Sequence, residues 1–160
     1  MMKKIVYLLL LVIVITGCSA QYSKMASRDI AALPKPESSP ALAVDIWLDC
    51  ETNKLGAYTV ELNYDPRIIS VSDIKTASDG GFPGAPMANP ATYATGKTVI
   101  IGMYTGNDLP DKKIKIAHIT FKPLISGTSP LAVSIQNTYD TDGKPLPASA
   151  ILSQETITVP

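Results

Sequence analysis

Cys18 is the residue whose neighbours point most directly to chemistry. A thiol can carry a diacylglyceryl group through a thioether bond, and the small residues Thr16 and Gly17 leave the preceding peptide bond open to a peptidase. Residues 5–15 are an unbroken apolar run behind a short basic segment, residues 1–4. Eleven apolar residues are too few to span a bilayer as a stable helix, but they suit the apolar region of a secretion signal. The sequence therefore predicts a cleaved signal next to a modified cysteine.

The order of apolar residue, two small residues and cysteine over residues 15–18 resembles the lipobox of bacterial lipoproteins. The resemblance implies that residues 1–17 are removed as a signal peptide and that Cys18 becomes the lipidated N-terminus. Ser19 rather than an Asp follows it, which in double-membraned bacteria resembles the pattern sent to the outer membrane. We therefore expect a membrane-anchored lipoprotein at the outer membrane or cell surface. An ordinary secretory signal or a membrane anchor with an incidental Cys is the alternative.

Composition limits what the mature chain can be. Without residues 1–17, 143 of the 160 residues remain, which is enough for one domain. Lys3 and Lys4 leave with the signal, so 12 basic residues face 14 acidic ones, and no basic patch points to nucleic acid. Cys50 is the one thiol of the folded part and cannot form an internal disulfide. We expect it to be small and half-buried; an intermolecular bridge is the alternative.

The titratable residues form no recognisable catalytic or metal site. His118 is the only histidine, and no cluster of His and Cys accompanies it, so we expect it to face solvent. Residues 140–143, Asp-Thr-Asp-Gly, look like the start of a calcium loop but lack its later oxygen ligands, and we interpret them as a tight turn. The sequence therefore predicts a protein that is not an enzyme and holds no metal or cofactor.

Trp47 is the sharpest surface candidate. It lies between Asp45 and Asp49, on the side of its segment that alternation makes polar. An exposed indole is a flat apolar platform that suits a sugar ring or a protein partner, and Tyr93 and Tyr104 would extend it. The alternative is that the segment is covered on both sides, or that the preceding chain folds over the ring.

The candidate residues above lie in two kinds of segment, a tether and a domain made of strands. Residues 18–43 predict a tether, since Pro34, Pro36 and Pro40 favour a semi-rigid extended chain. Residues 44–160 predict a domain made of strands, because apolar and polar residues alternate with a period of two. The expected strands are 44–49, 57–64, 97–104, 115–121, 131–136 and 155–159, separated by turn residues. No convincing helical period is present, so the fold class is all-β, a β-sandwich.

Several segments in order resemble the cohesin family. Residues 55–74, with a glycine before a strand that ends in Tyr64-Asp65-Pro66, are similar to its signature, and the later matches are residues 96–100, 116–121, 126–131, 140–146 and 156–159. The resemblance covers about residues 44–159. It implies a jelly-roll β-sandwich of about eight or nine strands that binds a dockerin module, in a fold related to carbohydrate-binding modules. We interpret Tyr64-Asp65-Pro66 as a marker of the fold.

The strand that enters this marker is the predicted recognition surface. Its outward residues are Ala57, Thr59, Glu61 and Asn63, which are short or singly charged and leave a flat face. Type I cohesins tend to carry Asn and Asp where this chain has Ala57 and Thr59, so the same charged contacts are not possible here. We expect protein–protein recognition at the cell envelope. Carbohydrate binding through Trp47, serving polysaccharide catabolism, and a structural envelope subunit are the alternatives.

Overall fold

The computed structural model describes residues 42–77, 81–106 and 112–160, so the expected signal, lipidated Cys18 and most of the tether lie outside the described residues. The described part consists of antiparallel strands and one short 3-10 helix, η1 (Pro90–Thr92). The prediction of an all-β sandwich is confirmed.

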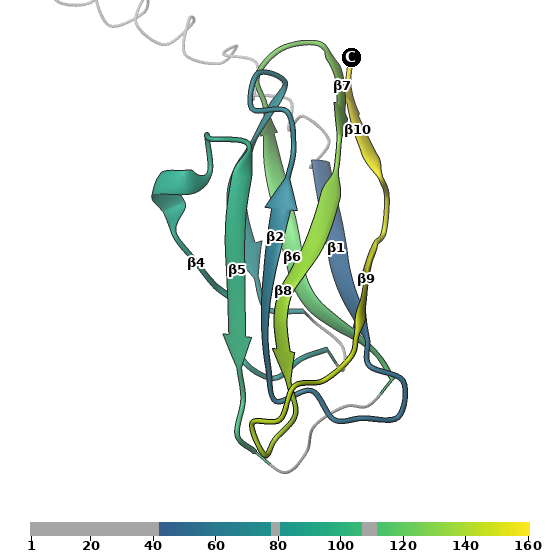
Figure 1. Ribbon diagram of the computed structural model, residues 1–160. Helices are drawn as coiled ribbons and strands as arrows, with labels where there is room; N and C mark the ends of the chain where they lie inside the picture. Colours follow the sequence, from purple (N-terminus) through teal and green to yellow (C-terminus); the bar gives the residue numbers. More distant parts are fainter. Residues whose placement is uncertain (1–41, 78–80, 107–111) are drawn as a thin grey trace, which may run out of the picture. The chain divides into compact units, whose positions relative to one another are not determined.

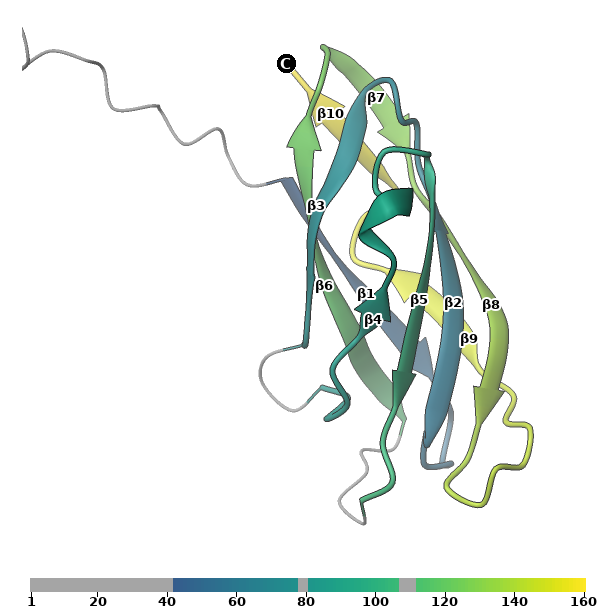
Figure 2. The ribbon, with the colours of Figure 1, turned by 90° about the vertical axis from the view of Figure 1, so that its left-hand side faces the viewer.

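Two four-stranded sheets pack face to face (Figures 1 and 2). The β1 sheet has the order β3 (Ile69–Lys75), β6 (Lys113–Pro123), β1 (Leu42–Asp49) and β9 (Ser149–Leu152). The β2 sheet has the order β4 (Met87–Ala88), β5 (Lys97–Met103), β2 (Ala57–Asn63) and β8 (Ala132–Tyr139). A separate ribbon pairs β7 (Gly127–Pro130) with β10 (Thr156–Val159).

The predicted alternation builds the core between the sheets. Val44, Ile46 and Leu48 of β1 point inward, and so do the side chains of Val60 and Leu62 from β2. Each side chain of this size that leaves water contributes on the order of 2 kcal/mol to folding. A shift in the β1–β6 register between Ile46 and Trp47 leaves both Ile116 and Ala117 of β6 buried.

Tyr58 ties the two sheets together across this core. Its ring is buried on β2, and its hydroxyl donates to the carbonyl oxygen of Ile116 in the opposite sheet at 3.1 Å. Burial raises the pKa of this hydroxyl, so it stays protonated and keeps its role as donor. Gly102 of β5 lies beside the ring, and a Cβ there would overlap it. The glycine is therefore needed for this close packing.

The Tyr64-Asp65-Pro66 segment anchors the end of β2. The Tyr64 hydroxyl is directed to the carbonyl oxygen of Tyr93 at 2.8 Å, which fastens the β4–β5 connection to the core. Asp65 accepts from the backbone N–H of Arg67 at 2.9 Å and from its guanidinium at 2.7 Å and 3.0 Å. These bonds from Arg67 lower the pKa of Asp65 to about 2. The contacts are those of a structural corner.

Three details of the structure differ from the sequence expectations or extend them. β4, β7 and β9, each only two to four residues long, are not among the expected strands. β3 overlaps the end of residues 55–74, the segment that resembles the cohesin signature. Cys50 is fully buried and not half-buried, and burial raises the pKa of its thiol to about 11. A thiol without access to solvent cannot bridge to another chain. Residues 140–143 form a turn, with Gly143 at φ 78°.

Candidate binding face

The outer face of the β2 sheet carries the four predicted recognition residues. Tyr58, Val60 and Leu62 point into the core, so the side chains between them, all half-buried, point outward from β2. These outward residues are Ala57, Thr59, Glu61 and Asn63. β2 lies between β5 and β8, so these residues run along the middle of the sheet.

β5 adds an apolar row that the sequence analysis did not assign to the face. In the β2–β5 register, Met103 lies opposite Ala57, Ile101 opposite Thr59 and Val99 opposite Glu61. Met103 is 64% exposed and Ile101 is 42% exposed. Met87 of β4, which pairs with Ile101, extends the row to the edge of the sheet and is also exposed. Exposed aliphatic side chains in a continuous row over two strands are typical of an interaction surface.

One end of this face is polar. Lys97 Nζ forms an ion pair with Glu61 at 3.1 Å, and Asn63 donates to the same carboxylate at 3.2 Å. The hydrogen bonds from Asn63 and Lys97 lower the pKa of Glu61 below its ordinary value. A partner that covers this end meets an already neutralised carboxylate.

The other end of the face opens into a shallow hollow of about 360 Å³. Ala57, Met103 and Tyr139 belong to both the outer face and the hollow, because Ala57 pairs with Met103 on one side and Tyr139 on the other. Tyr104 and Gly143 line it as well. The face is therefore an apolar strip that ends in a depression, a shape into which a protruding side chain fits.

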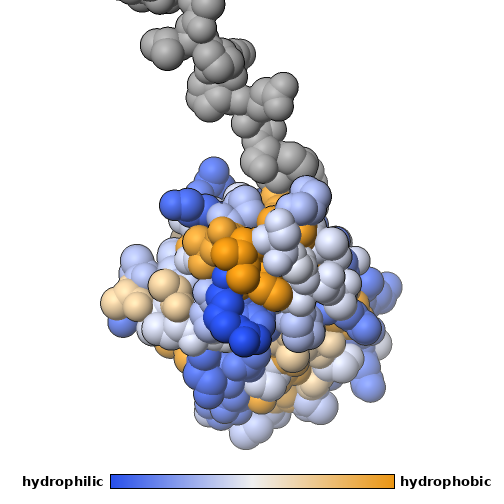
Figure 3. Space-filling view, turned by 90° about the horizontal axis from the view of Figure 1, so that it is seen from above, coloured by the Kyte–Doolittle hydropathy of each residue, from blue (hydrophilic) through white to orange (hydrophobic). Residues whose placement is uncertain are grey.

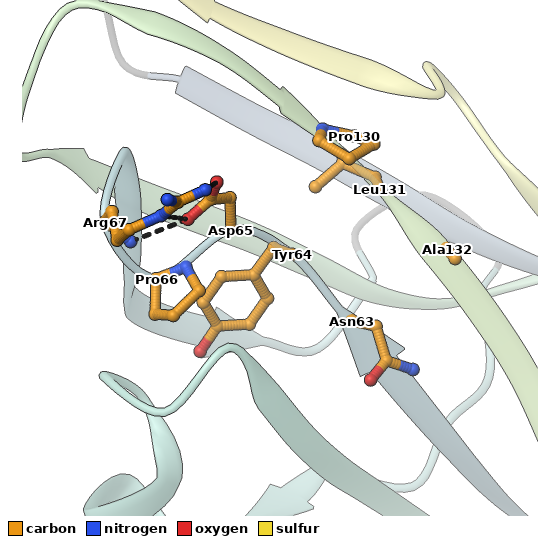
Figure 4. Close-up of a pocket in the computed structure, with 8 residues that line it drawn as sticks. All are labelled: Asn63, Tyr64, Asp65, Pro66, Arg67, Pro130, Leu131 and Ala132. Atoms are coloured by element: carbon orange, nitrogen blue, oxygen red, sulfur yellow. Dashed lines mark hydrogen bonds and ion pairs between the residues drawn. The ribbon is translucent and has the colours of Figure 1, made fainter.

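A second hollow lies at the end of β2 near β8 (Figure 4). Its wall includes the Tyr64–Arg67 corner on one side and Pro130, Leu131 and Ala132 on the other. Figure 4 shows the Arg67 guanidinium turned back onto Asp65. Both charges of the hollow are already engaged with each other, so its geometry fits a structural corner better than a ligand site.

Trp47 lies on the outer face of the other sheet, half-buried on β1. Lys113 Nζ and Lys115 Nζ lie 5.2 Å and 5.1 Å from the centroid of its ring, within cation–π range. Lys115 also pairs with Asp45 at 3.0 Å, and His118 Nδ1 lies 2.7 Å from the same carboxylate. The indole is thus part of a charged network contributed by the neighbouring strand β6.

The three predicted platform aromatics are not brought together. Tyr93 follows η1, and its carbonyl oxygen accepts from Tyr64 and Ser70. Tyr104 follows β5, and its ring packs edge-on against Phe82 at 6.5 Å. Within the described residues, no ring pair joins Trp47 to either tyrosine. The Trp47 site therefore depends on one indole and its lysines.

Residues 2–19 match the family model described as the prokaryotic membrane lipoprotein lipid attachment site. A sequence comparison with curated proteins finds no match. In structure, the chain is similar to CaCohA2 of Clostridium acetobutylicum, crystallised in a complex with CaDoc0917, with a TM-score of 0.61 and 20% identity over 75% of this chain and 89% of that one.

Two further similar structures are cohesins from different organisms. A non-cellulosomal cohesin from the archaeon Archaeoglobus fulgidus has a TM-score of 0.51 and 16% identity over 66% of this chain and 71% of that one. The seventh ScaB type I cohesin from Pseudobacteroides cellulosolvens has a TM-score of 0.51 and 14% identity over 68% and 79%. The domain has the cohesin fold.

In the described residues of the domain, no three His, Cys, Asp or Glu side chains lie close enough together to hold a metal ion. In the same residues, buried side-chain oxygen and nitrogen atoms all have hydrogen-bond partners. No helix of this part of the chain has the length and hydropathy to cross a membrane.

The apolar row of β5, which the sequence analysis did not assign to the face, has a recognisable pattern in the sequence. Val99, Ile101 and Met103 alternate with residues that the fold buries, so the strand is apolar on both sides. A strand with apolar residues on both sides is either buried on both faces or exposes one apolar face. Only the sheet order, which places β5 next to the short edge strand β4, decides between these two cases.

Proposed function

We propose that this protein is a membrane-tethered, non-catalytic module that recognises a protein partner through the outer face of its β2 sheet. The observation that carries the proposal is the exposed apolar row of Met87, Val99, Ile101 and Met103 beside β2. The fold does not need these side chains, because the inward residues of the same strands already fill the core. A protein surface would remove them from water.

The partner class that we propose is dockerin-like. CaCohA2, which shares the fold, was crystallised in a complex with CaDoc0917, and the cohesin resemblance of the sequence implies the same kind of partner. Ala57 and Thr59 are small and uncharged, and their neighbours across the strands include Ile101, Met103 and Tyr139. We therefore expect the partner to contribute apolar side chains at this part of the face.

The attachment to the membrane completes the proposal. The lipid attachment site over residues 2–19 indicates a lipoprotein anchored to a membrane. We propose residues 1–17 as the signal peptide, 18–43 as the lipidated Cys18 and tether, and 44–160 as the recognition domain, displayed at the outer membrane or cell surface. The last two residues of the expected tether, 42 and 43, already belong to β1. Cys18→Ser should abolish incorporation of labelled fatty acid; unchanged labelling would contradict the anchor.

Carbohydrate binding through Trp47 is the second candidate, favoured by its half-exposed indole on the other sheet. Lys113 and Lys115 lie against this ring, so a sugar that stacks there has to displace or share them. A glycan with carboxylate groups would suit the two ammonium groups better than a neutral one.

The test compares cross-linking from the two outer faces of the tethered protein. A photo-activatable residue replaces Ser134 of β8, opposite Glu61, or Thr120 of β6 on the other sheet. We expect an adduct of defined size in the source envelope from position 134 alone. Thr59→Arg should remove this adduct, because burial of an unpaired charge costs several kcal/mol, about 3 or more.

Thr120→Arg is the matched control, since it adds the same charge to the opposite face and should leave the adduct intact. Both variants should keep their unfolding midpoint, since surface substitutions usually change stability by less than about 0.5 kcal/mol. An adduct that persists in Thr59→Arg, or that forms only from position 120, would overturn the proposal.

A further inference from the structure

The turn between β6 and β7 exposes two consecutive aliphatic side chains. Leu124 is 45% exposed and Ile125 is 56% exposed. Their backbone N–H groups both donate to the carbonyl oxygen of Ile68, at 2.8 Å and 3.5 Å, and the Ile68 side chain lies under Gly127. The turn is thus held firmly on the body of the sandwich while its apolar side chains face outward. Figure 3 looks down on this end and shows an apolar patch, in orange, beside hydrophilic side chains, in blue.

β1 begins at this same end of the sandwich. β1 runs antiparallel to β6, and its first residue, Leu42, pairs with Phe121, three residues before Leu124. Leu42, the first residue of β1, therefore lies at the end of the sandwich where β6 finishes. Residues 19–41 separate Leu42 from Cys18, and 23 residues extend over at most about 80 Å. The lipid and the apolar turn are joined to the same end of the sandwich.

We propose that the Leu124–Ile125 turn docks onto the surface of the bilayer that holds the Cys18 lipid. Two aliphatic side chains alone bind a membrane weakly, but a tethered domain has a high effective concentration at its own membrane. The β2 face runs along the strands, so this docking leaves it free for a partner. The proposal rests on lipid attachment and is independent of what the β2 face binds.

The test measures how close each end of the tethered domain lies to lipid. The lipidated full chain is reconstituted in phosphatidylcholine vesicles and recovered by flotation, with a fluorophore on Lys122→Cys or, at the opposite end, on Asp142→Cys. Nitroxide-labelled lipid should quench the first label at least about threefold more than the second. Leu124→Ser with Ile125→Ser should reduce the quenching at position 122 to that at position 142.

Ile151→Ser is the control, because Ile151 is a half-exposed aliphatic residue beside Trp47 on β9, away from this turn. It should leave quenching at position 122 unchanged. Thermal melts followed by circular dichroism should be the same for all variants, because the changed residues lie outside the core. Equal quenching at both ends, or quenching that survives the double substitution, would overturn the proposal. A shift in oligomeric state on the double substitution would assign the turn to a second copy of the chain instead.

Discussion

The two sheets of this domain have outer faces of opposite character. The outer face of the β1 sheet is charged: Asp45 pairs with Lys115 and His118, and Lys113 and Lys115 lie over Trp47. The outer face of the β2 sheet exposes Val99, Ile101 and Met103, with the Glu61–Lys97 ion pair at one end. Both sheets contribute apolar side chains to the core between them. The difference between the outer faces therefore does not follow from the packing of the core.

The largest effect should come from removing the apolar row of the β2 sheet, which is the feature that distinguishes its outer face from that of the β1 sheet. Met87→Thr, Val99→Thr, Ile101→Thr and Met103→Thr together should reduce partner binding at least about a hundredfold, because each fully buried aliphatic side chain contributes about 1.5–3 kcal/mol by leaving water. Threonine keeps β propensity, so the free energy of unfolding should change by less than about 1 kcal/mol. Denaturant melts and partner titration measure the two quantities. A variant that unfolds would show that the row belongs to the fold and would remove the contrast.

An intermediate effect is expected at Trp47. Trp47→Ala removes a half-buried ring and two cation–π contacts, and should lower the free energy of unfolding by about 1.5 kcal/mol while leaving partner binding unchanged. Glycan-array retention measured in parallel tests the second candidate function. Lost retention in this variant, together with full binding by Thr59→Arg, would transfer the recognition role to the charged face.

The smallest effect should come from Asp45→Asn, with a reduction of about 1 kcal/mol at neutral pH. Partial burial raises the pKa of Asp45, but the hydrogen bonds from His118 and Lys115 outweigh it and hold the pKa below its ordinary value. A lowered pKa in the folded state adds stability above the unfolded value, near 3.8, and this stability is lost as pH falls through the folded value. Melts between pH 7 and pH 2 should therefore show a shallower acid loss in the variant. An unchanged acid slope would mean that the pair contributes nothing to folding.

The inner faces could be predicted from the sequence, and much of the outer surface could not. Tyr58, Val60 and Leu62 alternate with polar or small residues, so their burial follows from the period alone. The lysines over Trp47 come from β6, more than sixty residues away, and their position depends on a register shift between Ile46 and Trp47 that no local pattern encodes. The apolar row of β5 was visible as composition, but which of its sides is exposed depends on sheet order.

The position of β1 in its sheet has a mechanical consequence for a tethered protein. Any load that reaches the domain through its tether enters at Leu42, and β1 is paired along eight residues with β6 and along four with β9. Ladder hydrogen bonds lie perpendicular to the strand, so a pull along its axis strains them together in shear. Bonds strained in parallel resist far more force than bonds opened one after another. The strand nearest the anchor is thus the one placed to carry tension, and drag on a captured partner should stretch the tether before it opens the sandwich.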